Sequence, residues 1–184
     1  MKAVLPQDVS LDTVDIWFQD ESRVGQQGSQ TRIWAETGTR PKLVKQQQFL
    51  YQYIFGAVCP VQKICAGIVV PSANQEGFQR HLEEISYHVP KNRHAVVVLD
   101  QAGWHKANQV NIPANLSLLY LPPYSPELNP QEKVWQYLKD TYLANRVFNT
   151  LEDIMHACWE AWSQFAKLPD LIQSLTNRQW AHIN

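Results

Sequence analysis

The sequence predicts an α/β domain in which a mixed central β-sheet is flanked by α-helices. Segments rich in β-branched and aromatic residues come first, which favours several early strands. Segments with helical spacing then alternate with two further strands. Residues 94–99 form a nearly continuous apolar run, which is typical of a strand buried on both faces of a parallel or mixed sheet.

The expected strands are short and are separated by turn residues. The first ends at the sequence Asp20-Glu21-Ser22, and Pro60 lies in a turn between two later strands. Basic side chains and a proline in residues 38–45 indicate a loop. In chain order, the expected strands are residues 14–19, 31–35, 49–58, 63–70, 94–99 and 116–121.

Four later segments have the pattern of amphipathic helices. In the first, Phe78, Leu82 and Ile85 fall on one face at helical spacing. The expected helices are residues 74–88, 130–143, 151–165 and 171–180. Residues 1–12 are expected to be a lead-in segment, and residues 13–184 a single domain with C-terminal helices.

Composition excludes several classes of protein. With 45% hydrophobic residues the chain has too much apolar surface to be mainly disordered, and its formal net charge of −1 argues against a histone-like DNA binder. The 3 cysteines form no CxxC pair, so a cysteine zinc site is not expected. No apolar run approaches the length of about 20 residues that a membrane helix needs. Together with the lack of a signal-peptide pattern, this predicts a cytoplasmic protein without a membrane partner.

Three carboxylates fall where a metal-dependent enzyme would need them. Asp20 follows the first expected strand, Asp100 follows the buried strand, and Glu132 lies in the first turn of a helix. Residues just beyond strand ends line the usual ligand crevice of an open sheet. Carboxylate oxygens suit Mg²⁺, and two such ions about 3.5–4 Å apart catalyse phosphoryl transfer in many enzymes.

Each acid also has a structural interpretation. Asp20 is a possible turn residue, and neighbouring Glu21 competes with it because successive strand side chains face opposite sides. Asp100 could cap a turn or a helix. Glu132 fits a capping box with Asn129 at the cap position, followed by a proline.

Three segments together resemble the DDE transposases. They are WFQDES at residues 17–22, VVLDQAGWH at residues 97–105 and LPPYSPELNPQEKVW at residues 121–135. More narrowly, they resemble the bacterial insertion-sequence 630 family, relatives of the mariner-like elements. The resemblance spans roughly residues 14–143, and its third segment is the most specific.

This resemblance implies an RNase H-like fold and a specific catalytic set. The catalytic and metal-binding acids carry over to Asp20, Asp100 and Glu132, with two Mg²⁺ or Mn²⁺ ions as cofactor. Glu127 is a competing third acid, although the gap to the second acid, already shorter than is usual in the family, would shrink further. Gln101 stands where the family usually has Asn, and Gln131 where Ile is common.

The resemblance further implies that double-stranded DNA is the partner, as transposon ends and a TA target, and that the protein acts as a homo-oligomer on DNA. Phosphate contacts come mostly from basic side chains and backbone amides, and aromatic rings can stack on bases. The candidate DNA-binding residues are Arg40, Lys42, Lys45, His105, Lys106, Tyr124 and Lys133. The alternative for each basic residue is a solvated surface charge, and for Tyr124 it is loop packing. Trp135, one helical turn after Glu132, is expected to pack in the core.

We therefore expect a transposase catalytic core that cleaves DNA with metal ions and joins the freed 3′-hydroxyl to a target. The alternatives are an RNase H-like nuclease or resolvase without strand transfer, and an inactive remnant that only binds DNA or a partner. Full-length relatives carry N-terminal helix-turn-helix domains, which these 184 residues lack. The chain is thus expected to be a catalytic half, which is the product of a split reading frame, a truncated copy or a trimmed piece of a longer protein.

Overall fold

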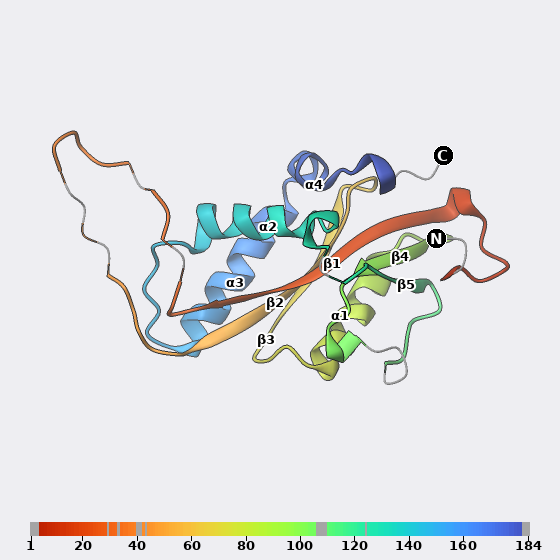
Figure 1. Ribbon diagram of the computed structural model, residues 1–184, viewed down its shortest axis with the longest axis horizontal. Helices are drawn as coiled ribbons and strands as arrows, with labels where there is room; N and C mark the ends of the chain where they lie inside the picture. The colour runs from red at the N-terminus through yellow and green to blue at the C-terminus, as the bar shows by residue number, and fades with distance from the viewer. Residues whose placement is uncertain are drawn as a thin grey trace.

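The computed structural model describes residues 4–28, 30–32, 34–39, 42, 44–105, 110–123 and 125–181. Its centre is one mixed five-stranded sheet of order β3-β2-β1-β4-β5 (Figure 1). Strands β3, β2 and β1 pair antiparallel, whereas β1, β4 and β5 run parallel. The strands are β1 (Val14–Gly25), β2 (Tyr51–Cys59), β3 (Ile64–Val70), β4 (His94–Leu99) and β5 (Leu116–Tyr120).

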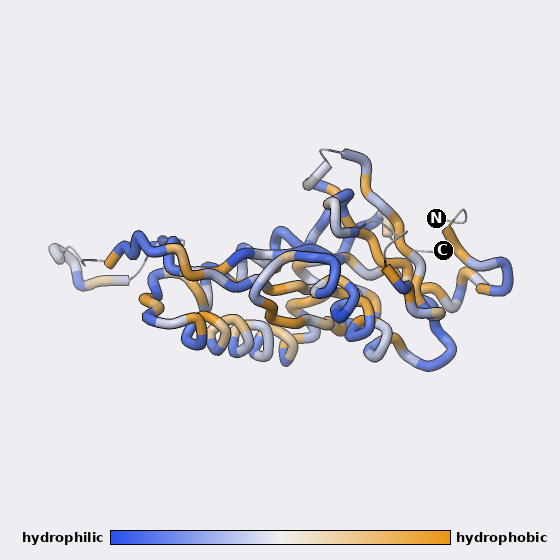
Figure 2. The backbone as a smooth tube through the Cα atoms, turned by 90° about the horizontal axis from the view of Figure 1, so that it is seen from below, coloured by the Kyte–Doolittle hydropathy of each residue, from blue (hydrophilic) through white to orange (hydrophobic). Residues whose placement is uncertain are grey.

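Helices cover both faces of this sheet. Strand β1 shows how its side chains divide between two cores, because Ile16 and Phe18 face one side while Trp17 faces the other. The first core contains residues from the later helices, α2 (Gln131–Leu138), α3 (Leu151–Ala166) and α4 (Pro169–Thr176). The second core is closed by α1 (Gln75–His88). Figure 2 shows mostly hydrophobic strands in the middle and hydrophilic turns around them.

Local sequence signals explain where two of the helices begin. Asn74 caps α1, with its side chain accepting a hydrogen bond from the Gly77 amide at 2.8 Å. Thr150 and Asp153 form a reciprocal capping box at the start of α3. None of the helices in the described residues has the length and apolar character of a membrane span.

Several expected elements differ from those in the structure. Strand β1 continues to Gly25 instead of ending at Asp20, because its pairing with β2 extends to Tyr51, beyond the residues that pair with β4. The described residues of segment 31–35 form no strand, and the Trp34 side chain lies fully exposed without a neighbouring strand. The helix expected over residues 130–143 is α2 followed by a π-helical turn at Lys139–Leu143.

Candidate active site

The parallel pairing of β1 and β4 brings the first two acids to the same level of the sheet. Phe18 on β1 pairs with Val98 on β4, and two residues further along each chain lie Asp20 and Asp100. Asp20 therefore lies within β1, not at its end, and it shares the face of Phe18 beneath α2. The third acid, Glu132, comes from the first turn of α2.

These three acids line a single pocket of about 270 Å³. Its other walls come from the start of the loop after β4, the proline-rich loop after β5 and the approach to α2. The lining residues are Asp20, Asp100, Gln101, Leu121, Pro122, Pro123, Ser125, Asn129 and Glu132. Within the described ranges, no three His, Cys, Asp or Glu side chains are arranged to hold an ion as they stand. The acids thus share a pocket without converging on one point.

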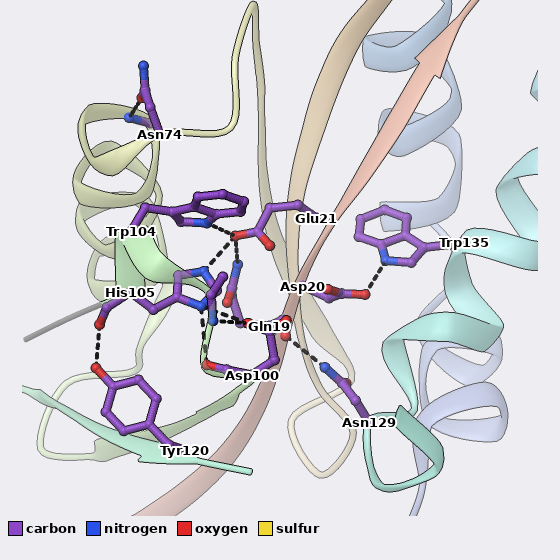
Figure 3. A network of polar contacts seen from close by, with 12 residues as sticks. Gln19, Asp20, Glu21, Asn74, Asp100, Trp104, His105, Tyr120, Asn129 and Trp135 are labelled. Atoms are coloured by element: carbon purple, nitrogen blue, oxygen red, sulfur yellow. Dashed lines mark hydrogen bonds and ion pairs between the residues drawn. The ribbon is translucent and has the colours of Figure 1, made fainter. Parts of the chain in front are cut away.

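The Asp20 carboxyl has a strongly raised pKa. Burial raises this pKa to about 7, and the negative charges of Glu21 and Glu132 act in the same direction. A hydrogen bond from Trp135 Nε1 to Asp20 Oδ2, at 2.9 Å, opposes this rise (Figure 3). A carboxylate held beside other acids in a partly buried pocket is stabilised by a bound cation. The pocket therefore fits Mg²⁺ or Mn²⁺.

The Asp100 side chain is 60% exposed. Its Oδ1 accepts a hydrogen bond from the Ala102 amide at 2.9 Å and lies 2.9 Å from His105 Nδ1. The contact with His105 is the main cause that lowers the pKa of the Asp100 carboxyl. Asp100 is therefore ionised at neutral pH and available to a cation.

His105 lies inside the protein, against the expectation that it contacts DNA. Only 1% of its surface is exposed, and its Nε2 lies 2.8 Å from Glu21 Oε1. Burial alone would lower the pKa of this imidazole, but the contacts with Asp100 and Glu21 raise it to about 9. The pKa of Asp100 and that of His105 thus shift in the directions expected of an ion pair.

The choice between the adjacent acids Asp20 and Glu21 follows from the pleat of β1. In Figure 3 the Asp20 side chain points toward Trp135, whereas the Glu21 side chain points the other way, toward Trp104 and His105. Glu21 Oε1 also accepts a hydrogen bond from Trp104 Nε1 at 3.4 Å. Only Asp20 lines the pocket.

Glu132 does not serve as a capping residue. The first residue of α2 is Gln131, and the helix has no side-chain cap among the described residues. Asn129 instead joins two elements, since its side-chain amide donates to the Gln19 carbonyl at 2.8 Å and its Oδ1 accepts from the Gln131 amide at 3.1 Å. Asn129 thus ties the start of α2 to β1 beside Asp20, and the exposed Glu132 side chain is left at the pocket.

Trp135 has a role that its sequence pattern does not reveal. It is buried in the core as expected, with its ring centroid 5.8 Å from that of Trp162, and it also holds Asp20. Gly56 lies opposite Asp20 on β2, and a Cβ at this position would lie within 2.5–2.6 Å of both tryptophan rings. In the sequence, Gly56 inside an apolar strand is the signal that a bulky group packs closely against the strand at this point.

The predicted DNA-binding residues fall into three groups. Lys42, Lys45 and Lys133 are exposed, as a phosphate contact requires, although none of them lines the acidic pocket. Arg40, Lys106 and Tyr124 lie outside the described residues. The third group is His105, which is buried.

A second pocket lies at the far end of β1 and was not expected from the sequence. It has a volume of about 150 Å³, and Arg23 and Lys139 are the basic residues in its wall. The Arg23 guanidinium lies 5.4 Å from the centroid of the Tyr51 ring, and exposed Phe49 also lines the pocket. Basic side chains beside exposed aromatic rings are suited to a nucleic-acid strand.

Solved structures support the fold assignment. The Mos1 mariner paired end complex with Mn has a TM-score of 0.57 at 13% identity, covering 94% of this chain and 58% of that chain. The Mos1 strand transfer complex also has a TM-score of 0.57, at 15% identity, covering 89% of this chain and 55% of that chain. The fold is therefore RNase H-like, and the chain spans somewhat more than half the length of these transposase chains.

Sequence comparison then identifies the family. Residues 15–155 match the DDE superfamily endonuclease family, and the chain belongs to it. The chain is also 47% identical over 133 residues to the uncharacterized protein y4pE/y4sA of Sinorhizobium fredii, covering 72% of this chain and 98% of that protein. The fold class and the family predicted from the sequence are thus confirmed.

Proposed function

We propose that this protein is the catalytic core of a bacterial insertion-sequence transposase, which cleaves DNA at the ends of the element and transfers the freed 3′-hydroxyl to a TA target. The observation that carries the proposal is the single pocket lined by Asp20, Asp100 and Glu132. Membership of the DDE superfamily endonuclease family supports the cleavage step. The similar Mos1 structures include a strand transfer complex, which supports the joining step.

Asp20, Asp100 and Glu132 are the residues that would hold two Mg²⁺ or Mn²⁺ ions. When bound, such ions stabilise the charge that develops on the phosphodiester oxygens and make an attacking water or hydroxyl more nucleophilic. Trp135 fixes one oxygen of Asp20, and Asn129 fixes the position of the helix that carries Glu132. The chain thereby supplies three carboxylates, one from β1, one from the segment after β4 and one from the first turn of α2.

Basic side chains would bring DNA to this pocket. Lys133 follows Glu132 directly on α2, and Lys42 and Lys45 lie in the long connection between β1 and β2. Arg23 and Lys139, in the second pocket, extend the basic surface toward the far end of β1. We place the reaction in the bacterial cytoplasm, with two or more copies of the chain acting on paired DNA ends.

A nicking assay tests the cleavage step without knowledge of the terminal repeats. Supercoiled plasmid is incubated with the protein and Mn²⁺, and loss of supercoiling is measured for the wild type and for Asp20→Asn, Asp100→Asn and Glu132→Gln. Each variant is expected to fall to the background rate, whereas Glu127→Gln, which changes an exposed acid just before α2, is the matched control and retains activity. Nicking that persists in the three variants would contradict the proposal.

The joining step needs a separate assay. Duplexes taken from the DNA that flanks the coding sequence, ending in a free 3′-hydroxyl, are incubated with a target plasmid. Covalent joining of the duplex to the plasmid at TA sites is the expected product. Cleavage without joining would instead identify a nuclease or resolvase.

A further inference from the structure

We propose that His105, backed by Glu21, is a positioning residue that orients Asp100 for metal binding. The inference rests on the proposed metal-binding role of Asp100. It concerns three side chains that contact one another in a row. The row leads from Asp100 in the acidic pocket, through the His105 imidazole, to Glu21 on the opposite face of the sheet (Figure 3).

The His105 ring is fixed at both ends. Its Nδ1 lies 2.9 Å from Asp100 Oδ1 and 3.2 Å from the Asp100 backbone carbonyl, and its Nε2 lies 2.8 Å from Glu21 Oε1. The Phe78 ring of α1 packs beside it, with ring centroids 4.4 Å apart. The Tyr120 hydroxyl donates a hydrogen bond to the His105 backbone carbonyl. The imidazole thus has a single orientation, and the contact with Asp100 is part of that orientation.

Asp100 receives little support from regular structure. It follows β4 in a segment without regular structure, and 60% of its side chain is exposed to solvent. An exposed carboxylate samples several rotamers, so ordering it costs conformational entropy when a ligand binds. The contacts of Oδ1 with His105 and the Ala102 amide hold one oxygen of the Asp100 carboxylate in place.

The Glu21 carboxylate, which contacts the His105 imidazole, is buried and hydrogen-bonded. Only 9% of its side chain is exposed, and Oε1 accepts hydrogen bonds from Gln19 Nε2 at 3.0 Å and from Trp104 Nε1 at 3.4 Å. A buried carboxylate is costly unless such partners satisfy it. An apolar residue would fill the same space beneath α1 at lower cost, so the retained charge points to a role in the adjacent site.

A nearby histidine provides the contrast. His81 on α1 is fully buried on the same side of the sheet, and its Nε2 lies 3.4 Å from the Ala66 carbonyl. In the described residues, its Nδ1 has no hydrogen-bond partner. His81 therefore matches His105 in burial and lacks the contact with an acid of the pocket.

The test measures Mn²⁺ binding to the metal-free protein by isothermal titration calorimetry. His105→Asn keeps an amide near the position of Nδ1, beside Asp100, whereas His105→Gln places its amide near Nε2, beside Glu21. Loss of a side chain that orients a metal ligand costs about 10- to 100-fold in affinity, so His105→Gln should raise the Mn²⁺ dissociation constant at least about tenfold. His105→Asn should remain within about threefold of the wild type because it retains the contact with Asp100. His81→Gln is the matched control, with affinity unchanged, and urea unfolding verifies that each variant is folded.

Each other outcome is decisive. If His105→Gln binds Mn²⁺ as the wild type does while Asp100→Asn does not, the positioning role is wrong and the proposed function stands. If His81→Gln loses as much affinity as the His105 variants, the effect is general to the buried layer and the positioning role is again wrong. If the wild type and Asp100→Asn bind Mn²⁺ equally, both the inference and the proposed function are contradicted. If both His105 variants lose the same affinity, with His81→Gln unaffected, restoring the contact with Asp100 does not restore binding, and the positioning role is again wrong.

Discussion

Replacing Asp20 by Asn should stabilise the metal-free protein, although Asp20 is the residue we expect to be essential for catalysis. The pKa of Asp20 rises from its ordinary value of 3.8 to about 7 in the folded protein, chiefly because the carboxyl is buried. At pH values between 3.8 and about 7, the Asp20 carboxyl is ionised in the unfolded chain but still protonated in the folded protein. The folded state therefore loses stability as the pH rises through this window, and the loss is complete above about pH 7.

The size of the effect follows from the pKa. Each unit of difference corresponds to about 1.4 kcal/mol, so ionised Asp20 costs the folded protein about 4 kcal/mol at pH 8. Asn carries no charge, and its side-chain oxygen can still accept the hydrogen bond from Trp135 Nε1. At about pH 4 the two proteins should differ by less than about 1 kcal/mol, because Asp20 is then protonated in the folded protein and only partly ionised in the unfolded chain.

Urea unfolding in the presence of EDTA at the two pH values measures this difference. Glu127→Gln removes an exposed carboxyl and should give no comparable gain at pH 8. Added Mn²⁺ should then stabilise the wild type at pH 8 and leave Asp20→Asn unchanged, because a ligand stabilises only the state that binds it. Equal stability of Asp20→Asn and wild type at pH 8 in EDTA would refute the reasoning, as would a less stable variant.

Three further substitutions test the surroundings of the pocket. Trp135→Phe removes the hydrogen bond to Asp20, which should raise the pKa of that carboxyl. Mn²⁺ binding should therefore weaken about tenfold near pH 6.5 and by less at pH 8. Calorimetric titration at the two pH values measures the Mn²⁺ affinity. Gly56→Ala would place a Cβ within 2.5–2.6 Å of two tryptophan rings and should destabilise the fold by about 1–3 kcal/mol in urea, whereas an unchanged midpoint would show that the rings relax freely. Gln131→Ile should stabilise the protein by about 1–3 kcal/mol in the same assay, because the buried amide has no hydrogen-bond partner in the described residues; a loss of stability would indicate that the amide has one.

Much of the site follows from the alternation of side chains along strands. Asp20 has the same parity as Ile16 and Phe18, which predicts that it faces the same side as these core residues, and the structure agrees. The apolar run before Asp100 predicts a central buried strand, and β4 does lie beside β1. The position of both acids was thus accessible from local sequence.

What the sequence did not reveal depends on contacts between distant residues. The end of β1 is set by pairing with β2, which local propensity near Asp20 does not encode. The burial of His105 depends on Phe78 of α1 and on Glu21 of β1, neither of which is close to it in sequence. The capping pattern before Glu132 failed because α2 begins at Gln131, with Pro130 at the cap position, one residue later than a cap at Asn129 requires.

The central claim is that Asp20, Asp100 and Glu132 together hold the metal ions of a DNA-cleaving enzyme. The most direct measurement is a crystal structure of the protein soaked in Mn²⁺, with anomalous scattering used to locate the ions. We expect anomalous density among these three carboxylates, which must draw closer together than in the metal-free arrangement. Density at other sites only, or none between these acids at saturating Mn²⁺, would contradict the account.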